Sequence, residues 1–329
     1  MKVAFFDTKP YDIPGFDRYA GPAGAEIKYY EANLNPDTVS LAAGFDAVCV
    51  FVNDTVNAEV VEDLHQMGVK TILLRCAGFN NVDIKACRGK LRVFRVPAYS
   101  PYAVAEHAMA LLLSVNRKIH KAHNRTREFN FSLQGLTGFD LHGKTVGIIG
   151  TGKIGRVFAD ICRGFGMQIL ASDPYPYPNA GLEYVSLEEL FRRSDIISLH
   201  CPLTEDTQHL VQAETIHQMK DGVVILNTSR GGLVNSEDLI QGLKSGKIGA
   251  ACLDVYEEEG DVFYEDLSGH ILQDDKLVRL IAMPNVIVTS HQAFLTREAL
   301  DNIASTTISN LVRFASGDPD TTTEVVWQE

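Results

Sequence analysis

The chain has 329 residues, enough for two domains of ordinary size, and 45% of them are apolar, so each domain can bury a core. The formal net charge of −12 argues against a protein that binds nucleic acid through its phosphates, because such binding needs a basic face. The N-terminus has no signal-peptide pattern, no run approaches 18 apolar residues, and the six cysteines form no CxxC pair. We therefore expect a cytoplasmic protein with reduced thiols, no metal site and no membrane span.

Five short apolar runs in the first hundred residues are typical of strands. Stretches long enough for helices or turns separate them. The predicted strands are 2–7, 26–31, 47–52, 71–75 and 92–96. This alternation predicts a small α/β domain at the start of the chain.

The segment 102–122 has a helical pattern, and its first part is apolar on nearly all sides, so we expect it to be buried on more than one face. Either the two domains cover it, or it lies in a subunit interface of a homo-oligomer, as a dimer or tetramer. Its basic end, from Arg117 to Arg127, is more typical of a solvated helix end than of an anion site. The segment 128–144 is expected to form an irregular arm.

The second half of the chain contains six further apolar runs, and their nearly continuous apolar character indicates strands buried on both faces of a parallel sheet. The predicted strands are 145–150, 168–173, 195–201, 222–229, 249–255 and 285–291, with helices at 153–165, 187–193 and 236–245. Repeated β-α-β units predict a doubly wound sheet. A last amphipathic helix at 298–315 could return to the first domain, and about the last dozen residues are expected to be loose.

The stretch GTGKIG places Gly150, Gly152 and Gly155 between a predicted strand and a predicted helix. Glycines there permit a tight turn and close approach of the backbone to a pyrophosphate, whose charge the helix N-terminus favours. Asp173 ends the next strand, where a carboxylate can bind the ribose hydroxyls and repel a 2′-phosphate. The pattern therefore predicts a dinucleotide site that prefers NAD to NADP. A glycine-rich packing turn is the structural alternative.

Polar residues follow each of these strands, at the sheet edge where ligands of open α/β sheets bind. Hydride transfer to the carbonyl of a 2-keto acid needs a proton donor, which histidine supplies, and a carboxylate anchor, which arginine supplies. Arg230, one of the three glutamates at 257–259, and His291 form such a set. Each also has a structural explanation: a hydrogen-bonded core histidine, a helix-capping arginine and a solvated acidic run.

Several ordered motifs resemble the D-isomer-specific 2-hydroxyacid dehydrogenase family: GTGKIG, HCPLT (200–204), NTSRGGLVN (227–235), DVYEEE (254–259) and TSHQAFLTREAL (289–300). Within that family, four more are similar to the fermentative D-lactate dehydrogenases of bacteria: FVND (51–54), LRCAGFNNVD (74–83), VPAYSPYAVAEHA (96–108) and NFSLQGLTGFDLHGK (130–144). The resemblance covers essentially the whole chain. It implies a Rossmann cofactor domain over 101–298 and a discontinuous, flavodoxin-like substrate domain over 1–100 and 299–329, with the active site in a cleft that closes.

The resemblance also implies roles for single residues. Arg230 would bind the substrate carboxylate, His291 would be the acid and base, and Glu259 would be its partner, while Glu257 and Glu258 are expected to be supporting or solvated. The implied cofactor contacts, beyond the glycines and Asp173, are Lys153, Ile154, Cys201, Pro202, Thr207, Thr228, Ser229 and Asp254. The implied substrate contacts are Ala77, Gly78, Tyr99, Phe51 and Phe294.

The function that the resemblance implies is NADH-dependent reduction of pyruvate to D-lactate, as in fermentation. A related enzyme for hydroxypyruvate, glyoxylate or a bulkier 2-keto acid is the first alternative, because one methylene changes selectivity by only about 1–3 kcal/mol. A nucleotide-sensing corepressor or scaffold with the same fold is a more remote alternative.

Overall fold

The structure is a computed structural model that describes residues 1–327. It divides into two compact units, described separately below. Unit 1 comprises Met1–Ser100 and the chain from Phe294 onward, and unit 2 comprises Pro101–Ala293. The sequence predicted that the chain returns to the first domain after residue 298, whereas in the structure it returns at Phe294. Both positions lie within the motif that begins at Thr289.

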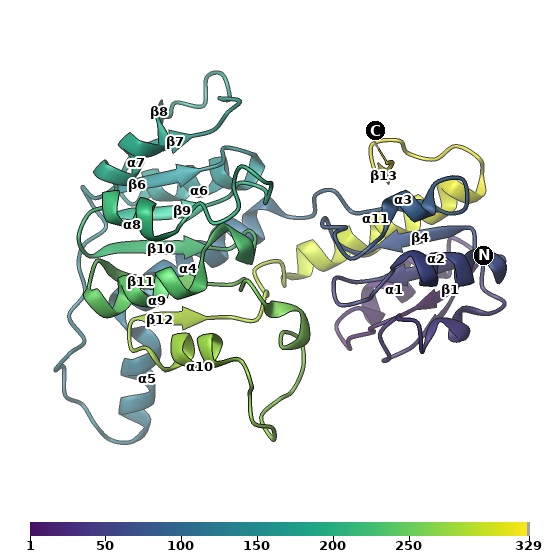
Figure 1. Cartoon of the computed structure of the whole chain (residues 1–329), viewed down its shortest axis with the longest axis horizontal. Helices are drawn as coiled ribbons and strands as arrows, with labels where there is room; N and C mark the ends of the chain where they lie inside the picture. Colours follow the sequence, from purple (N-terminus) through teal and green to yellow (C-terminus); the bar gives the residue numbers. More distant parts are fainter. Residues whose placement is uncertain (328–329) are drawn as a thin grey trace. The chain divides into compact units, whose positions relative to one another are not determined.

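Unit 2 is built on a seven-stranded parallel sheet in the order β12-β11-β10-β9-β6-β7-β8 (Figure 1). Its strands are β6 (Thr145–Ile149), β7 (Gln168–Ser172), β8 (Glu183–Tyr184), β9 (Ile196–Leu199), β10 (Val223–Asn227), β11 (Ile248–Leu253) and β12 (Val286–Val288). The strand order reverses beside β6, which pairs with both β7 and β9. Such a reversal leaves a crevice for a ligand at the carboxyl ends of the strands. The predicted doubly wound sheet is confirmed, although the sequence did not predict the short β8.

Helices cover both faces of this sheet, so alternate strand residues enter two separate cores. α4 and α6 pack against one face, and α7 to α10 pack against the other. The elements are α4 (Pro101–Arg117), α5 (Ile119–Arg127), α6 (Lys153–Gly164), α7 (Leu187–Arg193), α8 (Ala213–Gln218), η2 (Gly231–Leu233), α9 (Ser236–Ser245), η3 (Glu259–Asp261) and α10 (Asp275–Ala282).

The predicted helix at 102–122 is two helices, because Lys118 adopts the left-handed conformation with φ of 52° and ends the regular hydrogen bonding. α4 contacts α6 and three strands of its own sheet, which explains its apolar character within unit 2 alone. α5 has no buried residue, in agreement with a solvated basic end. Residues 128–144 contain no helix or strand, as expected for an arm.

Unit 1 contains a six-stranded sheet in the order β13-β5-β4-β3-β1-β2. Its strands are β1 (Lys2–Phe5), β2 (Glu26–Tyr29), β3 (Ala47–Val50), β4 (Thr71–Leu74), β5 (Arg92–Phe94) and β13 (Glu324–Val325), and its helices are α1 (Ile13–Ala20), η1 (Val39–Ala42), α2 (Ala58–Gln66), α3 (Ile84–Cys87) and α11 (Arg297–Ala315). α11, predicted at 298–315, packs against α1 and β4.

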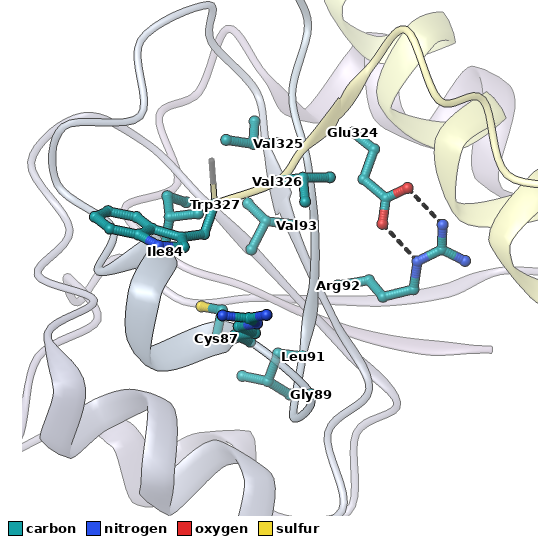
Figure 2. Close-up of a pocket in the computed structure, with 11 residues that line it drawn as sticks. Ile84, Cys87, Gly89, Leu91, Arg92, Val93, Glu324, Val325, Val326 and Trp327 are labelled. Atoms are coloured by element: carbon teal, nitrogen blue, oxygen red, sulfur yellow. Dashed lines mark hydrogen bonds and ion pairs between the residues drawn. The ribbon is translucent and has the colours of Figure 1, made fainter. Parts of the chain in front are cut away.

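The prediction of a loose C-terminal tail is wrong for residues 324–325, which form β13 antiparallel to β5. Figure 2 shows the reason: the guanidinium of Arg92 donates from Nε and Nη2 to the two carboxylate oxygens of Glu324, at 2.6 and 2.5 Å. Beside this pair, Trp327 and its neighbours line a cavity of about 530 Å³ that contains none of the predicted site residues.

Candidate active site

The glycine loop after β6 shows why three small residues are needed. Gly150 has φ of 93°, and a Cβ added to it would lie 2.5 Å from the backbone N of Cys201. A Cβ added to Gly155 would lie 2.0 Å from Gly150 O, so that glycine lets α6 pack closely on the loop. A Cβ added to Gly152 would meet no atom within 4 Å. No contact with the described residues therefore requires glycine at 152, whereas close approach of a pyrophosphate would.

α6 begins at Lys153, directly after this loop. The first N–H groups of a helix, here those of Lys153 and Ile154, have no partner within the helix and carry its positive dipole. They are therefore suited to a phosphate, as predicted from the sequence.

Asp173 follows β7 and is held in one orientation by its neighbours. Its Oδ2 accepts hydrogen bonds from Thr151 N at 2.6 Å and Thr151 Oγ1 at 3.0 Å, and its Oδ1 accepts one from Tyr175 N at 2.8 Å. Burial alone would raise the pKa of this carboxyl, but the hydrogen bonds outweigh it and lower the pKa. The group therefore stays ionised, and its remaining lone pairs can accept ribose hydroxyls.

The ends of β9 and β10 lie side by side in the sheet, and their loops are joined where Ser229 Oγ donates to Cys201 O at 2.7 Å. Pro202 is exposed, and Thr207 Oγ1 donates to the Pro202 carbonyl at 2.7 Å, which closes the turn. Thr228 Oγ1 is buried and has no hydrogen-bond partner within residues 1–327. A buried hydroxyl is rarely left unsatisfied, so this one is suited to a ligand group at the crevice.

His291 and Glu259 are in direct contact, although 32 residues separate them: His291 Nδ1 lies 2.9 Å from Glu259 Oε1. The other carboxylate oxygen accepts a hydrogen bond from Tyr256 N at 2.9 Å, so both oxygens are fixed. His291 has φ of 52°, a conformation that a histidine keeps only when its surroundings hold it. Tyr264 stacks on the imidazole with ring centroids 6.1 Å apart, and its hydroxyl donates to His291 O at 3.1 Å.

Asp254, at the end of β11, holds the segment that carries His291. Its carboxylate accepts hydrogen bonds from Thr289 Oγ1 at 2.6 Å and from the backbone N–H groups of Gln292 and Ala293 at 2.9 and 2.8 Å. His107 Nε2, from α4, lies 3.3 Å from Asp254 Oδ1. Because both oxygens are engaged inside unit 2, the contact of Asp254 with the cofactor stays a prediction.

Arg230 follows β10, and its position is set by the loop rather than by side-chain pairing. Among the described residues, its guanidinium makes one hydrogen bond, from Nη1 to Ser229 O at 2.7 Å. The next residue, Gly231, lies against the loop that leads to Glu259, since a Cβ added to it would fall 2.0 Å from Tyr256 O. Most donors of the guanidinium fork thus remain available to a carboxylate.

The predicted residues of unit 1 form two groups within that unit. Arg95 Nη1 donates to Ala77 O at 2.9 Å and so holds the loop that contains Gly78. Phe294 contacts both predicted aromatic neighbours, with ring centroids 6.0 Å from Phe51 and 6.2 Å from Tyr99.

Sequence reasoning did not single out three residues that the structure brings into the site of unit 2: Thr151, His107 and Tyr264. For His107 a signal existed, because a histidine inside a helix that is apolar on nearly all sides needs a polar partner. Tyr264 carried no such signal, because its contact with His291 depends on the path of a loop. Within residues 1–327 there is no group of three or more His, Cys, Asp or Glu that could hold a metal ion, and no helix long and apolar enough to cross a membrane.

Comparison with known proteins gives consistent matches over both units. The family model described as "D-isomer specific 2-hydroxyacid dehydrogenase, NAD binding domain" matches residues 109–293. The D-lactate dehydrogenase of Escherichia coli (strain K12) is 51% identical over 322 residues, which cover 97% of this chain and 98% of that protein.

Two solved structures are similar over nearly their full length. The pyruvate reductase of Chlamydomonas reinhardtii superposes with a TM-score of 0.92 at 43% identity and covers 97% of each chain. A D-isomer specific 2-hydroxyacid dehydrogenase from Lactobacillus delbrueckii ssp. bulgaricus, in its NAD-complexed form, superposes with a TM-score of 0.84 at 30% identity, covering 99% of this chain and 100% of that one.

Proposed function

The chain belongs to the D-isomer specific 2-hydroxyacid dehydrogenase family, and on that premise we propose that it is an NAD-dependent D-lactate dehydrogenase that reduces pyruvate to D-lactate. The observation that carries the proposal is the contact of His291 Nδ1 with Glu259 Oε1, at 2.9 Å, at the carboxyl edge of a dinucleotide-binding sheet. A fixed imidazole beside such a sheet is suited to proton transfer during carbonyl reduction.

NAD is the cofactor of this family, and the glycine loop, the orphan hydroxyl of Thr228 and the ionised Asp173 fit it. When bound, its reduced form supplies the hydride for the keto carbon. Lys153 and Ile154 would hold the pyrophosphate through their backbone N–H groups. Cys201, Pro202 and Thr207 would line the adenosine side, and Thr228 and Ser229 the nicotinamide side.

His291 would give a proton to the keto oxygen of the substrate. Because Nδ1 is engaged by Glu259, Nε2 is the ring nitrogen that can carry this proton. Glu259 would keep the ring in one orientation and stabilise the imidazolium, and Tyr256 N–H in turn fixes Glu259. Asp254 would hold the backbone on both sides of the histidine by binding Thr289, Gln292 and Ala293.

Arg230 would bind the substrate carboxylate with the planar guanidinium fork, which matches a carboxylate in geometry and charge. In unit 1, the backbone at Ala77 and Gly78 would be the further anchor for the same carboxylate. Phe294 contacts both Phe51 and Tyr99, and we assign these three rings to the small methyl group of the substrate. Packed aromatic rings of this kind favour pyruvate over bulkier 2-keto acids.

The initial rate of NADH oxidation with pyruvate, hydroxypyruvate, glyoxylate and phenylpyruvate tests the proposal, followed by the chirality of the product. We expect the highest kcat/KM with pyruvate, and D-lactate as the product. Preference for another acid would retain the family and reassign the substrate, with attention moving to the three aromatic residues. NADH binding without turnover of any of these acids would favour the scaffold alternative.

Two further proposals concern the setting of the enzyme. All six cysteines are buried, and none of them forms a disulfide within residues 1–327, which is typical of a reducing compartment and supports a cytoplasmic fermentative role. Phe129, Phe131 and Leu133 of the arm are exposed, at 84%, 72% and 80%, and such apolar residues support a homo-oligomer, either a dimer or a tetramer. Sedimentation velocity would measure the oligomeric state.

A further inference from the structure

A second imidazole–carboxylate pair lies next to Glu259 in the sequence. His209 Nε2 lies 2.5 Å from Glu257 Oε1, while Glu257 Oε2 accepts hydrogen bonds from Ser236 N at 3.2 Å and Ser236 Oγ at 3.0 Å. We call these three residues the Glu257 clasp. The side chain of Glu257 is 23% exposed, whereas that of its neighbour Glu258 is 57% exposed and pairs with Lys276. The acidic run is therefore not uniformly a solvated surface.

The environment of Glu257 keeps its carboxylate charged. Burial alone would raise its pKa, but hydrogen bonds from His209 and Ser236 outweigh burial and lower it. Ser236 is the first residue of α9, so the positive end of that helix adds to the attraction. Such charge-assisted hydrogen bonds are roughly twice as strong as neutral ones.

The clasp joins the loops that follow three adjacent strands, β9, β10 and β11. His209 N donates to Gly232 O at 2.8 Å, which ties the loop after β9 to the segment that follows Arg230. Gly231 lies against Tyr256 O, which ties the same segment to the loop after β11. The side chain of Glu257 closes this arrangement from the third loop, so the two segments that carry Arg230 and Glu259 share one anchor.

A short path connects the clasp to the acid–base pair. Tyr256, the residue before Glu257, donates its N–H to Glu259 Oε2 at 2.9 Å, and Glu259 Oε1 contacts His291 Nδ1 at 2.9 Å. His209 and His291 also share a strained backbone, with φ of 51° and 52°. Residues in this conformation persist only where several contacts hold them, which is common around active sites.

From this geometry we propose that Glu257, held by His209 and Ser236, is a positioning residue for the reaction: it fixes the Tyr256 N–H that orients Glu259 against His291. This inference rests on the proposed function. Among the described residues, the Glu257 side chain forms its hydrogen bonds and ion pair with His209 and Ser236 and not with the acid–base pair or Arg230, so it acts through Glu259. A misplacement of about 1 Å at a reacting group can reduce a rate by about 10²-fold.

Glu257→Ala is the variant that removes the clasp, and Glu258→Ala is its matched control from the same acidic run. We expect Glu257→Ala to lower kcat for pyruvate by about 10- to 100-fold, with little change in NADH affinity. Glu257→Gln retains an acceptor for Ser236 and a group that can hydrogen bond to His209, so it should recover most of the rate. Glu258→Ala should behave as the unaltered protein. Equal rates for Glu257→Ala and Glu258→Ala would overturn the proposal.

A double-mutant cycle separates positioning from general support of the fold. If the clasp acts through Glu259, Glu257→Ala should cause no further loss in a Glu259→Gln background. The same fold-loss in both backgrounds would show that Glu257 acts elsewhere, for example on Arg230, and would refute the proposed path. His209→Asn, which suits the left-handed backbone and leaves Ser236 paired with Glu257, should give a smaller loss than Glu257→Ala.

A measurement that needs no turnover keeps this inference distinct from the proposed function. The His291 Nδ1 proton, identified in NMR spectra of the NADH-bound protein by its absence in His291→Gln, should appear downfield because it is hydrogen bonded to Glu259. We expect the resonance to persist in Glu258→Ala and to be lost or broadened in Glu257→Ala. Its persistence unchanged in Glu257→Ala would reject positioning, whichever keto acid the enzyme reduces.

Discussion

At the carboxyl edge of the unit 1 sheet, one guanidinium and three carboxylates are sealed from solvent. At the corresponding edge of unit 2, the carboxylates of Asp254, Glu257 and Glu259 are paired with imidazoles that solvent still reaches. Arg75 follows β4, is 2% exposed, and donates from Nη2 to Asp7 O at 2.5 Å. Its Nε lies 3.6 Å from Asp12 Oδ2, and its guanidinium lies over the rings of Phe5 and Phe51. The His291 side chain is ten times more exposed, at 20%.

This contrast shows how one architecture can use charge in two ways. A charge buried with its partners exchanges no proton with a ligand, and removal of one partner leaves the others uncompensated. A half-buried imidazole fixed by one carboxylate can still exchange a proton through its free nitrogen. We therefore expect substitution of the His291 imidazole in unit 2 to change turnover, and substitution of the buried Arg75 cation in unit 1 to change stability.

The largest effect should come from His291→Gln, which removes the proton donor. General acid catalysis contributes about 10²–10⁴-fold, so kcat should fall by that factor. NADH affinity, measured by the fluorescence of the bound cofactor, should be unchanged because the ring does not belong to the glycine loop. Near-normal turnover in this variant would refute the assignment of His291 as the proton donor.

Arg230→Ala should reduce kcat/KM for pyruvate by about 10²–10³-fold, since hydrogen bonds to charged groups contribute about 1.5–3 kcal/mol each. The urea midpoint should stay the same, because the guanidinium makes a single hydrogen bond to the part of the chain that the structure describes. Arg230→Lys keeps the charge without the fork and should recover only part of the activity. Unchanged kinetics in the alanine variant would refute carboxylate binding by Arg230.

Arg75→Met should affect stability, unlike the two variants of unit 2. It should lower the free energy of unfolding by about 3–5 kcal/mol, because three buried carboxylates lose their shared cation. Trp327 is the single tryptophan and lies in unit 1, so its fluorescence reports the unfolding of that unit in urea. Arg18→Met is the control: it breaks an exposed ion pair with Asp301 in the same unit and should change stability by less than about 1 kcal/mol. Similar losses of stability in Arg75→Met and Arg18→Met would show that the buried charge cluster contributes no more to stability than an exposed ion pair.

The smallest expected effect is a dependence of the stability of unit 1 on pH. Burial raises the pKa of Asp54 to about 6, against the opposing effects of Arg75 and of hydrogen bonds from Phe51 N and Leu34 N. Its protonated form is favoured in the folded state, so its contribution is fully present below about pH 4 and is lost as pH rises through about 6. The urea midpoint of unit 1, measured by tryptophan fluorescence, should therefore fall as pH rises from about 4 to about 6.

Asp54→Asn cannot titrate and should flatten that slope, even though it loses one acceptor and is less stable at every pH. The difference in slope, rather than the midpoint itself, is the measurement. A slope identical to that of the unaltered protein would mean that Asp54 does not titrate in this range.

Several features were predictable from the sequence because their causes are local. The apolar runs predicted every strand of both sheets except the short β8 and β13, since strands of a parallel sheet are buried on both faces and are therefore apolar residue by residue. GTGKIG predicted its own turn, because the positive φ of Gly150 and the close approach of Gly155 to Gly150 O both arise within six residues of chain. The helix at 298–315 followed from its periodicity, and α11 differs from it by one residue at its start.

Features that depend on contacts distant in the chain were not predictable from the residues alone. The residues alone did not show which of the three adjacent glutamates pairs with His291. Only the path of the loop brings Glu259 to His291 and turns Glu257 toward His209, which is 48 residues away. β13 likewise depends on Arg92, which is 232 residues from Glu324. Sequence by itself determined the strands other than β8 and β13, the glycine loop and the chemistry available at the strand ends. Tertiary structure decided which side chains meet there, because strand order and loop path, not spacing along the chain, bring them within hydrogen-bonding distance.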